Sequence, residues 1–299
     1  MAEASEPLPA SGDGSQPKTA FVFAGGGSFG AVQVGMLRSL AAHGVTADMV
    51  VGSSVGAINA AYYAGTPTIE GIARLAKIWC SLRRRDVFPI SPRVLLGLMR
   101  RRDFLLGSEG LYRLVHAHLP YRNLEDARIP VYIVATDLLS GEAAILSEGP
   151  AAQAIVASTA IPAAFAPVKF DERYLADGAI TSCTPVKVAV MLGAKRLIVL
   201  PTGYACARET PPQGAIANAL HALTLLMSRQ VRSELESLDE GIDFHVAPPL
   251  CPLKGSPYDF SQTAELIERA AASTDAWLAN RGLERREIPH QMNAHKHNK

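Results

Sequence analysis

The feature that most constrains this chain is the segment 50–57, with the sequence VVGSSVGA. The spacing Gly52-x-Ser54-x-Gly56 is that of a nucleophile elbow, a sharp turn from strand to helix that exposes a serine hydroxyl at a sheet edge. Such a turn needs glycine on both sides, because a Cβ there would crowd the adjoining strand and helix. The first amides of the following helix, from Val55 onward, would point toward the atom that the serine attacks. An ordinary glycine-serine turn has the same pattern, so the surrounding sequence must decide.

A second glycine-rich turn precedes this segment. Residues 19–24 are apolar, aromatic and β-branched, which is typical of a buried strand, and they lead into the loop 25–30 (GGGSFG). A helical pattern over 31–43 and a second apolar strand over 48–52 follow. The order strand, glycine loop, helix, strand, elbow, helix predicts a three-layer α/β/α fold, with a mainly parallel central sheet flanked by helices.

The rest of the chain continues this alternation. Further strands are expected at 129–138, 143–146, 168–170, 174–176, 196–201 and 243–247, and further helices at 68–85, 108–118, 150–160, 185–192, 215–238 and 260–280. The segment 91–102 (SPRVLLGLMRRR) is basic and amphipathic. Because it is short, it fits a cap helix over the core better than a helix lying on an anionic membrane surface.

Composition narrows the compartment and the class of partner. A net charge of +1 over 299 residues argues against a nucleic-acid partner held by bulk electrostatics. The cysteines are scattered without a C-x-x-C pair, which indicates reduced thiols and no disulfide or zinc framework: Cys80, Cys183, Cys206 and Cys251. No signal peptide or membrane-spanning pattern is visible, so we expect a cytoplasmic protein that contacts membranes only at their surface.

The glycine loop has a second interpretation. Gly25-x-Gly27-x-x-Gly30, placed between a strand and a helix, matches the fingerprint of dinucleotide-binding proteins. That function requires an acidic residue at the carboxyl end of the second strand, whereas Asp48 lies at the amino end and Ser54 follows the carboxyl end. In a hydrolase the same loop would offer amides to the oxyanion that forms on an attacked carbonyl. Dinucleotide binding remains the alternative from a different class of protein.

A serine nucleophile needs a general base. Histidine comes last in the common α/β-hydrolase order, but the late His245 sits inside an apolar strand pattern. Asp177 fits better, because it follows a strand and precedes Gly178 on a turn that can approach the carboxyl edge of the sheet. A plain Asp-Gly turn is the simpler explanation of the same dipeptide.

Four motifs in this order resemble the patatin-like phospholipases: Gly25-Gly26-Gly27-x-x-Gly30, Gly52-x-Ser54-x-Gly56, Ala157-Ser158-x-Ala160-x-Pro162 and Asp177-Gly178-Ala179, with Pro185 beyond them. The resemblance covers roughly residues 19–200. It implies a three-layer α/β/α fold and a Ser–Asp dyad without histidine. It also implies hydrolysis of lipid or phospholipid acyl esters without a metal or cofactor. A catalytically inactive, lipid-binding relative would share these motifs.

The resemblance assigns roles to individual residues. Ser54 would be the nucleophile and Asp177 the general base. Oxyanion-binding amides would come from two segments: Gly25, Gly26 and Gly27, and Val55. The remaining motif glycines are Gly30, Gly52, Gly56 and Gly178. One position departs from the family pattern, since Phe29 stands where an arginine or lysine is usual. We expect a disordered tail over 1–17, one hydrolase domain over 18–288 and a loose polar tail over 289–299.

Overall fold

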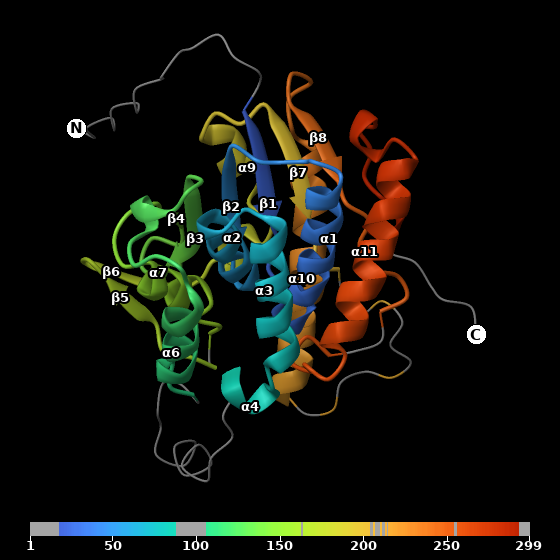
Figure 1. The fold of residues 1–299 in the computed structure, drawn as a ribbon. Helices are drawn as coiled ribbons and strands as arrows, with labels where there is room; N and C mark the ends of the chain where they lie inside the picture. Colours follow the sequence, from blue (N-terminus) through green and yellow to red (C-terminus); the bar gives the residue numbers. More distant parts are fainter. Residues whose placement is uncertain are drawn as a thin grey trace, which may run out of the picture.

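A mixed sheet of eight strands forms the centre of the described chain (Figure 1). The structure, a computed structural model, describes residues 18–87, 106–162, 164–203, 206, 210, 213, 215–253 and 256–292. The strand order is β5-β6-β3-β2-β1-β7-β8, and β4 pairs with β3. The strands are β1 (Thr19–Phe23), β2 (Met49–Ser53), β3 (Val131–Asp137), β4 (Ala143–Leu146), β5 (Val168–Phe170), β6 (Arg173–Asp177), β7 (Arg196–Leu200) and β8 (Asp243–Val246).

The strand register brings the ends of distant segments to one edge of the sheet. β1 pairs in parallel with β2 and β7, so Phe23 lies beside both Gly52 and Leu200. β3 is parallel to β2, whereas β6 runs antiparallel to β3 and sets Asp177 beside Ala135. The turns that follow β1, β2 and β7 therefore lie at the same edge, where parallel α/β sheets commonly bind ligands. Asp177 at the end of the antiparallel β6 reaches this edge too, because its partner Ala135 directly follows Val134, the partner of Ser53.

Helices cover both faces of the sheet. One layer consists of α1 (Gly30–Ala42), α2 (Val55–Gly65), α3 (Ile69–Ser81), α6 (Glu109–His118), α7 (Ala151–Ser158) and α11 (Thr263–Ala279). The other consists of α8 (Ala179–Ser182), α9 (Val186–Met191) and α10 (Ala215–Glu236). Short pieces complete the described chain: α4 (Arg84–Val87) and the 3₁₀ helices η1 (Gly27–Phe29), η2 (Leu124–Asp126), η3 (Gly282–Glu284) and η4 (His290–Met292).

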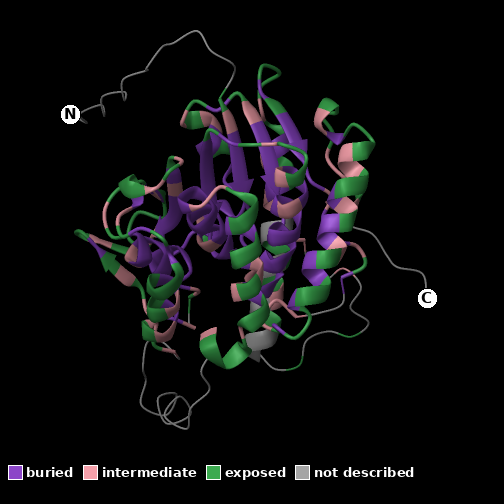
Figure 2. Ribbon diagram, in the orientation of Figure 1, coloured by how far each residue is buried: buried purple, intermediate pink, exposed green. Residues whose placement is uncertain are grey.

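Two separate apolar cores lie on the two faces of the sheet. Successive strand side chains point to opposite faces, so Phe21 and Phe23 pack with α1 and α2 while Ala20 and Val22 pack with α9. Figure 2 shows the central strands buried along their length and the outer helices buried mainly on their inner sides. The predicted three-layer α/β/α fold is confirmed.

Several details differ from the sequence-based expectation. The helix expected over 68–85 breaks at Leu82, which is extended (φ −66°, ψ 138°), and α4 begins only at Arg84. Asp177 is the last residue of β6 rather than part of a turn, because it pairs with Ala135 of β3. The glycine loop contains a 3₁₀ helix, η1, that no sequence pattern indicated. The expected tail over 1–17, the amphipathic segment 91–102 and residues 293–299 lie outside the described residues.

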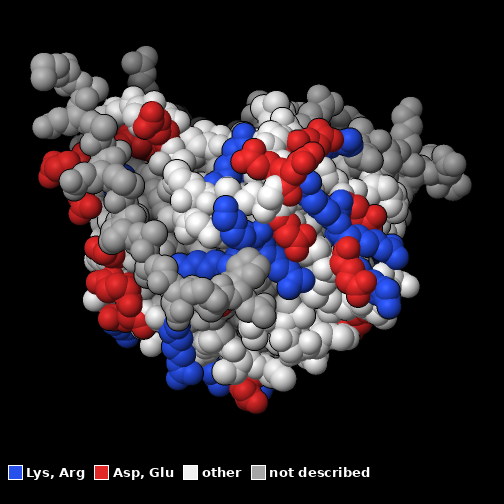
Figure 3. Space-filling view, turned by 90° about the horizontal axis from the view of Figure 1, so that it is seen from above, with Lys and Arg blue, Asp and Glu red and all other residues white. Residues whose placement is uncertain are grey.

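The face where β1 begins carries intermingled charges. Figure 3 shows basic and acidic side chains side by side on the described part of this face. At the start of β7 and β8, Arg196 Nε lies 3.6 Å from a carboxylate oxygen of Asp243. None of the helices in the described ranges is both long and apolar enough to cross a membrane.

Candidate active site

Ser54 occupies a backbone conformation that few residues other than glycine adopt. It stands between β2 and α2 with φ 54° and ψ −129°. Both flanking glycines are required sterically: an added Cβ on Gly52 would collide with the Gly56 carbonyl, and one on Gly56 would collide with the Phe23 carbonyl. The sequence G-x-S-x-G therefore lets α2 start directly against the end of the sheet, and the strained turn projects the Ser54 side chain beyond it.

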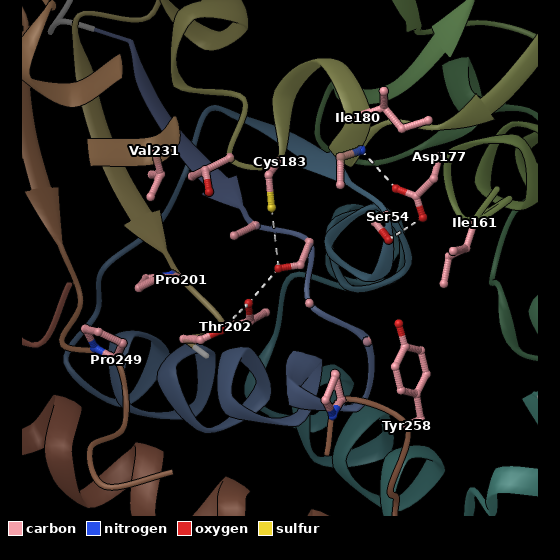
Figure 4. A pocket seen from close by; sticks show the side chains of 18 of the residues that line it. Ser54, Ile161, Asp177, Ile180, Cys183, Pro201, Thr202, Val231, Pro249 and Tyr258 are labelled. Atoms are coloured by element: carbon pink, nitrogen blue, oxygen red, sulfur yellow. Dashed lines mark hydrogen bonds between the residues drawn. The ribbon is translucent and has the colours of Figure 1, made fainter. Parts of the chain in front are cut away.

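The Ser54 hydroxyl is bonded to a carboxylate from far along the chain. Ser54 Oγ donates to Asp177 Oδ2 at 2.8 Å, across 123 residues of sequence (Figure 4). The other carboxylate oxygen, Oδ1, accepts from the amide of Ala179 at 2.9 Å. Both side chains are buried, with Ser54 8% and Asp177 3% exposed. This geometry places a base in direct contact with the hydroxyl that it would deprotonate.

Burial changes the acidity of this carboxyl group. Loss of hydration raises the pKa of Asp177 from 3.8 to about 6, although hydrogen bonds from Ala179 and Ser54 act in the opposite direction. A carboxylate with a raised pKa is a stronger base than an exposed aspartate and is still ionised at neutral pH. Asp177 therefore combines contact with Ser54 and a basicity suited to proton transfer.

Ser158 supports the strained turn from behind. Its hydroxyl accepts from the Ser54 amide at 2.9 Å and donates to the Val134 carbonyl at 2.6 Å. Gly178 lies so close to the same carbonyl that a Cβ there would collide with it. These contacts connect the turns after β2 and β6 to β3. The sequence analysis identified the motif that contains Ser158, but it did not predict that the Ser158 hydroxyl bonds to the turn at Ser54.

The glycine loop is fixed by bonds to its carbonyl groups. Gln33 Nε2 donates to the Ala24 carbonyl at 2.8 Å, and Thr202 Oγ1 donates to the Gly25 carbonyl at 2.6 Å. Gly26 and Gly27 adopt φ values of 154° and 59°, which glycine tolerates and other residues rarely do. Sequence patterns gave no sign of Gln33 or Thr202, because each acts on this loop only through the fold.

Gly25 does not have the role expected from the sequence. Its amide already donates to the Cys183 carbonyl at 2.8 Å, so it has no hydrogen left to offer an oxyanion. An added Cβ on Gly25 would lie 3.1 Å from the Ser54 Cβ, which shows that the loop packs directly against the elbow. The amides of Gly26, Gly27 and Val55 have no hydrogen-bond partner within the described residues.

A buried polar network holds the helices beneath this loop. Asn59 donates to Gln33 Oε1 at 2.8 Å and accepts from Trp79 Nε1 at 2.8 Å. Gln33 and Asn59 are fully buried, and Trp79 is 3% exposed. Because buried polar groups are costly unless they are bonded, this network fixes one arrangement of α1, α2 and α3 around the end of β1.

Two cavities meet at Ser54. The first contains the Ser54–Asp177 pair, and its wall includes Gly26, Ile161, Ile180, Thr202, Pro249 and Tyr258 (Figure 4). The second runs between α2, α3, α6 and α7 and is lined almost wholly by apolar side chains, among them Ile58, Trp79, Leu111, Leu114, Ile155 and Phe165. Ser54, Gly27 and Ile161 line both cavities. The hydroxyl is thus set where two largely apolar spaces join.

The residues of the competing interpretations lie elsewhere. The ring nitrogens of His245 bond to Asp243 Oδ2 at 2.9 Å and to the Arg285 carbonyl at 3.1 Å, so neither faces Ser54. Asp48 accepts from the Thr19 amide at the start of β1, at the opposite edge of the sheet from the glycine loop. A ribose-binding acid is therefore missing from the place where dinucleotide binding needs one. Within the described residues no group of three or more acidic, histidine or cysteine side chains could hold a metal ion.

One pair of cysteines is closer than the scattered sequence positions indicated. Cys206 Sγ and Cys251 Sγ lie 3.8 Å apart, across 45 residues of sequence. Cys183 is buried beside the glycine loop and Cys80 is exposed. All four are thiols in this structure.

Solved structures with a similar fold include two that cover most of this chain. VipD from Legionella pneumophila aligns with a TM-score of 0.45 and 15% identity, over 89% of this chain and 67% of that one. Human GIVD cytosolic phospholipase A2, in complex with methyl gamma-linolenyl fluorophosphonate, aligns with a TM-score of 0.47 and 12% identity, over 90% of this chain and 58% of that one.

Relatives are also found by sequence. An uncharacterised NTE family protein of Mycobacterium bovis is 29% identical over 221 residues, which are 73% of this chain and 57% of the relative. Patatin-like phospholipase domain-containing protein 7 of Rattus norvegicus is 27% identical over 186 residues, 62% of this chain and 13% of the relative. This chain thus spans little more than half of the mycobacterial protein and a small part of the rat protein.

The family assignment rests on the segment that builds the site. A profile described as patatin-like phospholipase matches residues 21–190, more than half of the chain. The match begins in β1, contains both the strained elbow at Ser54 and the carboxylate of Asp177, and ends in α9. The chain belongs to the patatin-like phospholipase family.

Proposed function

We propose that this protein is a serine hydrolase that cleaves acyl esters of lipids, of the phospholipase A or lysophospholipase type. The observation that carries the proposal is the 2.8 Å hydrogen bond from Ser54 Oγ to Asp177 Oδ2 at the junction of two apolar cavities. Family membership supports the same class of reaction.

The reaction would proceed in two halves. Ser54 Oγ attacks the ester carbonyl carbon while Asp177 takes the hydroxyl proton, and the carbonyl oxygen becomes an oxyanion. The alcohol then leaves with the proton returned by Asp177, and an acyl-enzyme remains. Water attacks this acyl-enzyme with Asp177 again as base, which releases the fatty acid and restores Ser54. The amides of Gly26, Gly27 and Val55 are proposed to bind the oxyanion in both halves.

The cavities support a lipid substrate. The second cavity would take the acyl chain, because its lining is apolar and it opens at Ser54. The first cavity would take the alcohol side of the ester next to Asp177, which has to protonate the leaving oxygen. A lipid-surface contact during catalysis follows from this assignment, since substrates with long acyl chains reside in membranes or micelles.

Activity-based labelling tests the proposal directly. A fluorophosphonate probe should label the wild-type protein, and peptide mapping should locate the adduct on Ser54. Ser54→Ala should abolish labelling and ester hydrolysis, and Asp177→Asn should lower both by at least 10³-fold, since the base is lost. Ser53→Ala is the matched control, because Ser53 is also buried but its hydroxyl makes no hydrogen bond in the described structure.

Two results would contradict the proposal. Full activity in Asp177→Asn would show that another group acts as base. Lipid binding by a folded wild-type protein without labelling or hydrolysis would instead indicate an inactive lipid-binding relative. Assays with lysophospholipid micelles and phospholipid vesicles, run beside a short-chain ester, would then define the substrate of an active protein.

A further inference from the structure

The glycine loop 25–30 carries no positively charged side chain that could face an oxyanion. The side chain of Phe29 is 2% exposed inside the core. Gly25 also offers no amide hydrogen, because its amide is bonded to Cys183. Of the three successive glycine amides in this loop, only those of Gly26 and Gly27 therefore remain for an oxyanion. A further donor would have to come from another polar group that faces Ser54.

A segment near the end of the chain is fixed to the same loop. The Ser28 amide donates to the Pro257 carbonyl at 2.7 Å, and Ser28 Oγ donates to the Ser256 carbonyl at 3.2 Å. The contact is so close that an added Cβ on Gly27 would collide with the Pro257 carbonyl. The Tyr258 amide in turn donates to Ser256 Oγ at 3.3 Å. Tyr258 is thus held by its backbone beside the glycine loop.

The side chain of Tyr258 reaches into the cavity that holds the Ser54–Asp177 pair. It forms part of the wall of that cavity, and Figure 4 shows its hydroxyl end directed toward Ser54. Burial, together with the negative charge of Asp177, raises the pKa of Tyr258 to about 12. The phenol consequently keeps its proton at neutral pH and can act as a hydrogen-bond donor there.

We propose that Tyr258 is a further catalytic residue, whose hydroxyl donates a hydrogen bond to the oxyanion formed when Ser54 attacks the ester. The inference rests on the proposed function. The ester has two oxygens near the reacting carbon. The leaving oxygen must face Asp177, from which it receives its proton. Tyr258 is anchored on the side of Gly27 and Ser28, so we assign its hydrogen bond to the other one, the carbonyl oxygen. This neutral donor would add to the amides of Gly26, Gly27 and Val55. Tyr258 lies beyond the family match, which ends at residue 190.

Removing only the hydroxyl tests this role. Tyr258→Phe should lower kcat on a soluble ester about 10²-fold, as loss of one oxyanion donor does. KM should change little, because the bond forms only when charge develops on the oxygen. Affinity for a trifluoromethyl ketone, which forms a tetrahedral adduct with serine, should fall with kcat. Tyr174→Phe is the matched control, since Tyr174 is 49% exposed on β6.

The outcomes separate this inference from the proposed function. Unchanged kcat in a folded Tyr258→Phe variant would overturn the inference, and so would a rise in KM with kcat retained, which indicates substrate binding alone. Thermal unfolding of the variant at the wild-type temperature would exclude loss of the fold as the cause of lower activity. If the wild-type protein showed no hydrolysis and no labelling at Ser54, the proposed function itself would fail, and Tyr258 would have no oxyanion to bind.

Discussion

The burial of Asp177 determines the pH range in which the proposed base can act. Only the ionised carboxylate can accept the Ser54 proton, and burial raises its pKa to about 6. We therefore expect kcat to rise tenfold per pH unit below 6 and to level off above it. Initial rates on a soluble ester between pH 4.5 and 8.5 would check this. If kcat instead reached its plateau just above pH 4, the ordinary pKa range of aspartate, the carboxyl group of Asp177 would be hydrated in solution.

The same shift in pKa predicts a cost in stability. Between pH 3.8 and 6 the folded carboxyl of Asp177 holds a proton that the unfolded chain releases. The stability contributed by this group is therefore complete below pH 4 and is lost as the pH rises through 6, a loss of about 3 kcal/mol. Asp177→Asn cannot ionise, so it should unfold at higher urea concentration than wild type at pH 7. The difference should shrink at pH 4; a variant less stable than wild type at both pH values would contradict this account.

Residues near the elbow differ in how far the sequence could reveal them. Ser54 and Asp177 stand in short motifs whose order in the chain indicated that they belong together, and the structure brings their side chains into contact. Their catalytic roles remain predictions. Thr202 and Tyr258 could not be found in this way, because only chain folding brings them to the glycine loop and to the cavity of Ser54, and neither carries a local signature. The misassigned amide of Gly25 has the same cause, since its partner Cys183 lies 158 residues away.

At the scale of elements, the length of acyl chain that the second cavity can hold depends on the four helices that line it, α2, α3, α6 and α7. Leu114 of α6 lines this cavity, which opens at Ser54. Leu114→Trp should shorten the space and shift preference toward short acyl chains, lowering kcat/KM for a long-chain ester about tenfold relative to a butyrate ester. A series of p-nitrophenyl esters of increasing chain length would measure the shift.

A control on the same helix makes this test specific. Tyr112→Trp adds bulk at a position that is 41% exposed and is not part of the cavity wall. It should leave the chain-length profile unchanged. Equal profiles for Leu114→Trp and wild type would show that acyl chains do not enter between these helices.

Most elements were evident from the sequence because their hydrophobic periods are strong. The break at Leu82 was not, since no glycine or proline marks it and the arginines that follow are compatible with a continuing helix. The short helices η1 and α8 were also missed, because pieces of three and four residues carry too little periodicity to detect. Both border the site, so the local geometry of the site was less predictable than the elements that support it.

At the scale of the whole molecule, the sheet order could not be derived from the sequence. A mainly parallel sheet was expected, but the insertion of β1 between β2 and β7 pairs Thr19 with Arg196, 177 residues later, and nothing local encodes that pairing. The antiparallel pairing of β6 with β3 spans only 42 residues, from Ala135 to Asp177, but it too has no local signal, and it carries Asp177 to the edge where Ser54 stands. The site thus depends on global topology, and the motifs only indicate which residues that topology must bring together.

This dependence predicts a large effect from a single methyl group where α2 meets the sheet. A Cβ on Gly56 would collide with the backbone carbonyls of Phe23 and Ala24, which cannot move without displacing β1. Gly56→Ala should therefore destabilise the protein by about 2 kcal/mol and lower activity further than its loss of stability accounts for, because Ser54 moves with α2. Gly241→Ala is the control, since no atom lies within 4 Å of an added Cβ there. Urea unfolding of both variants, with kcat measured far below their midpoints, would test this; equal stability of the two would show that α2 and β1 can separate freely.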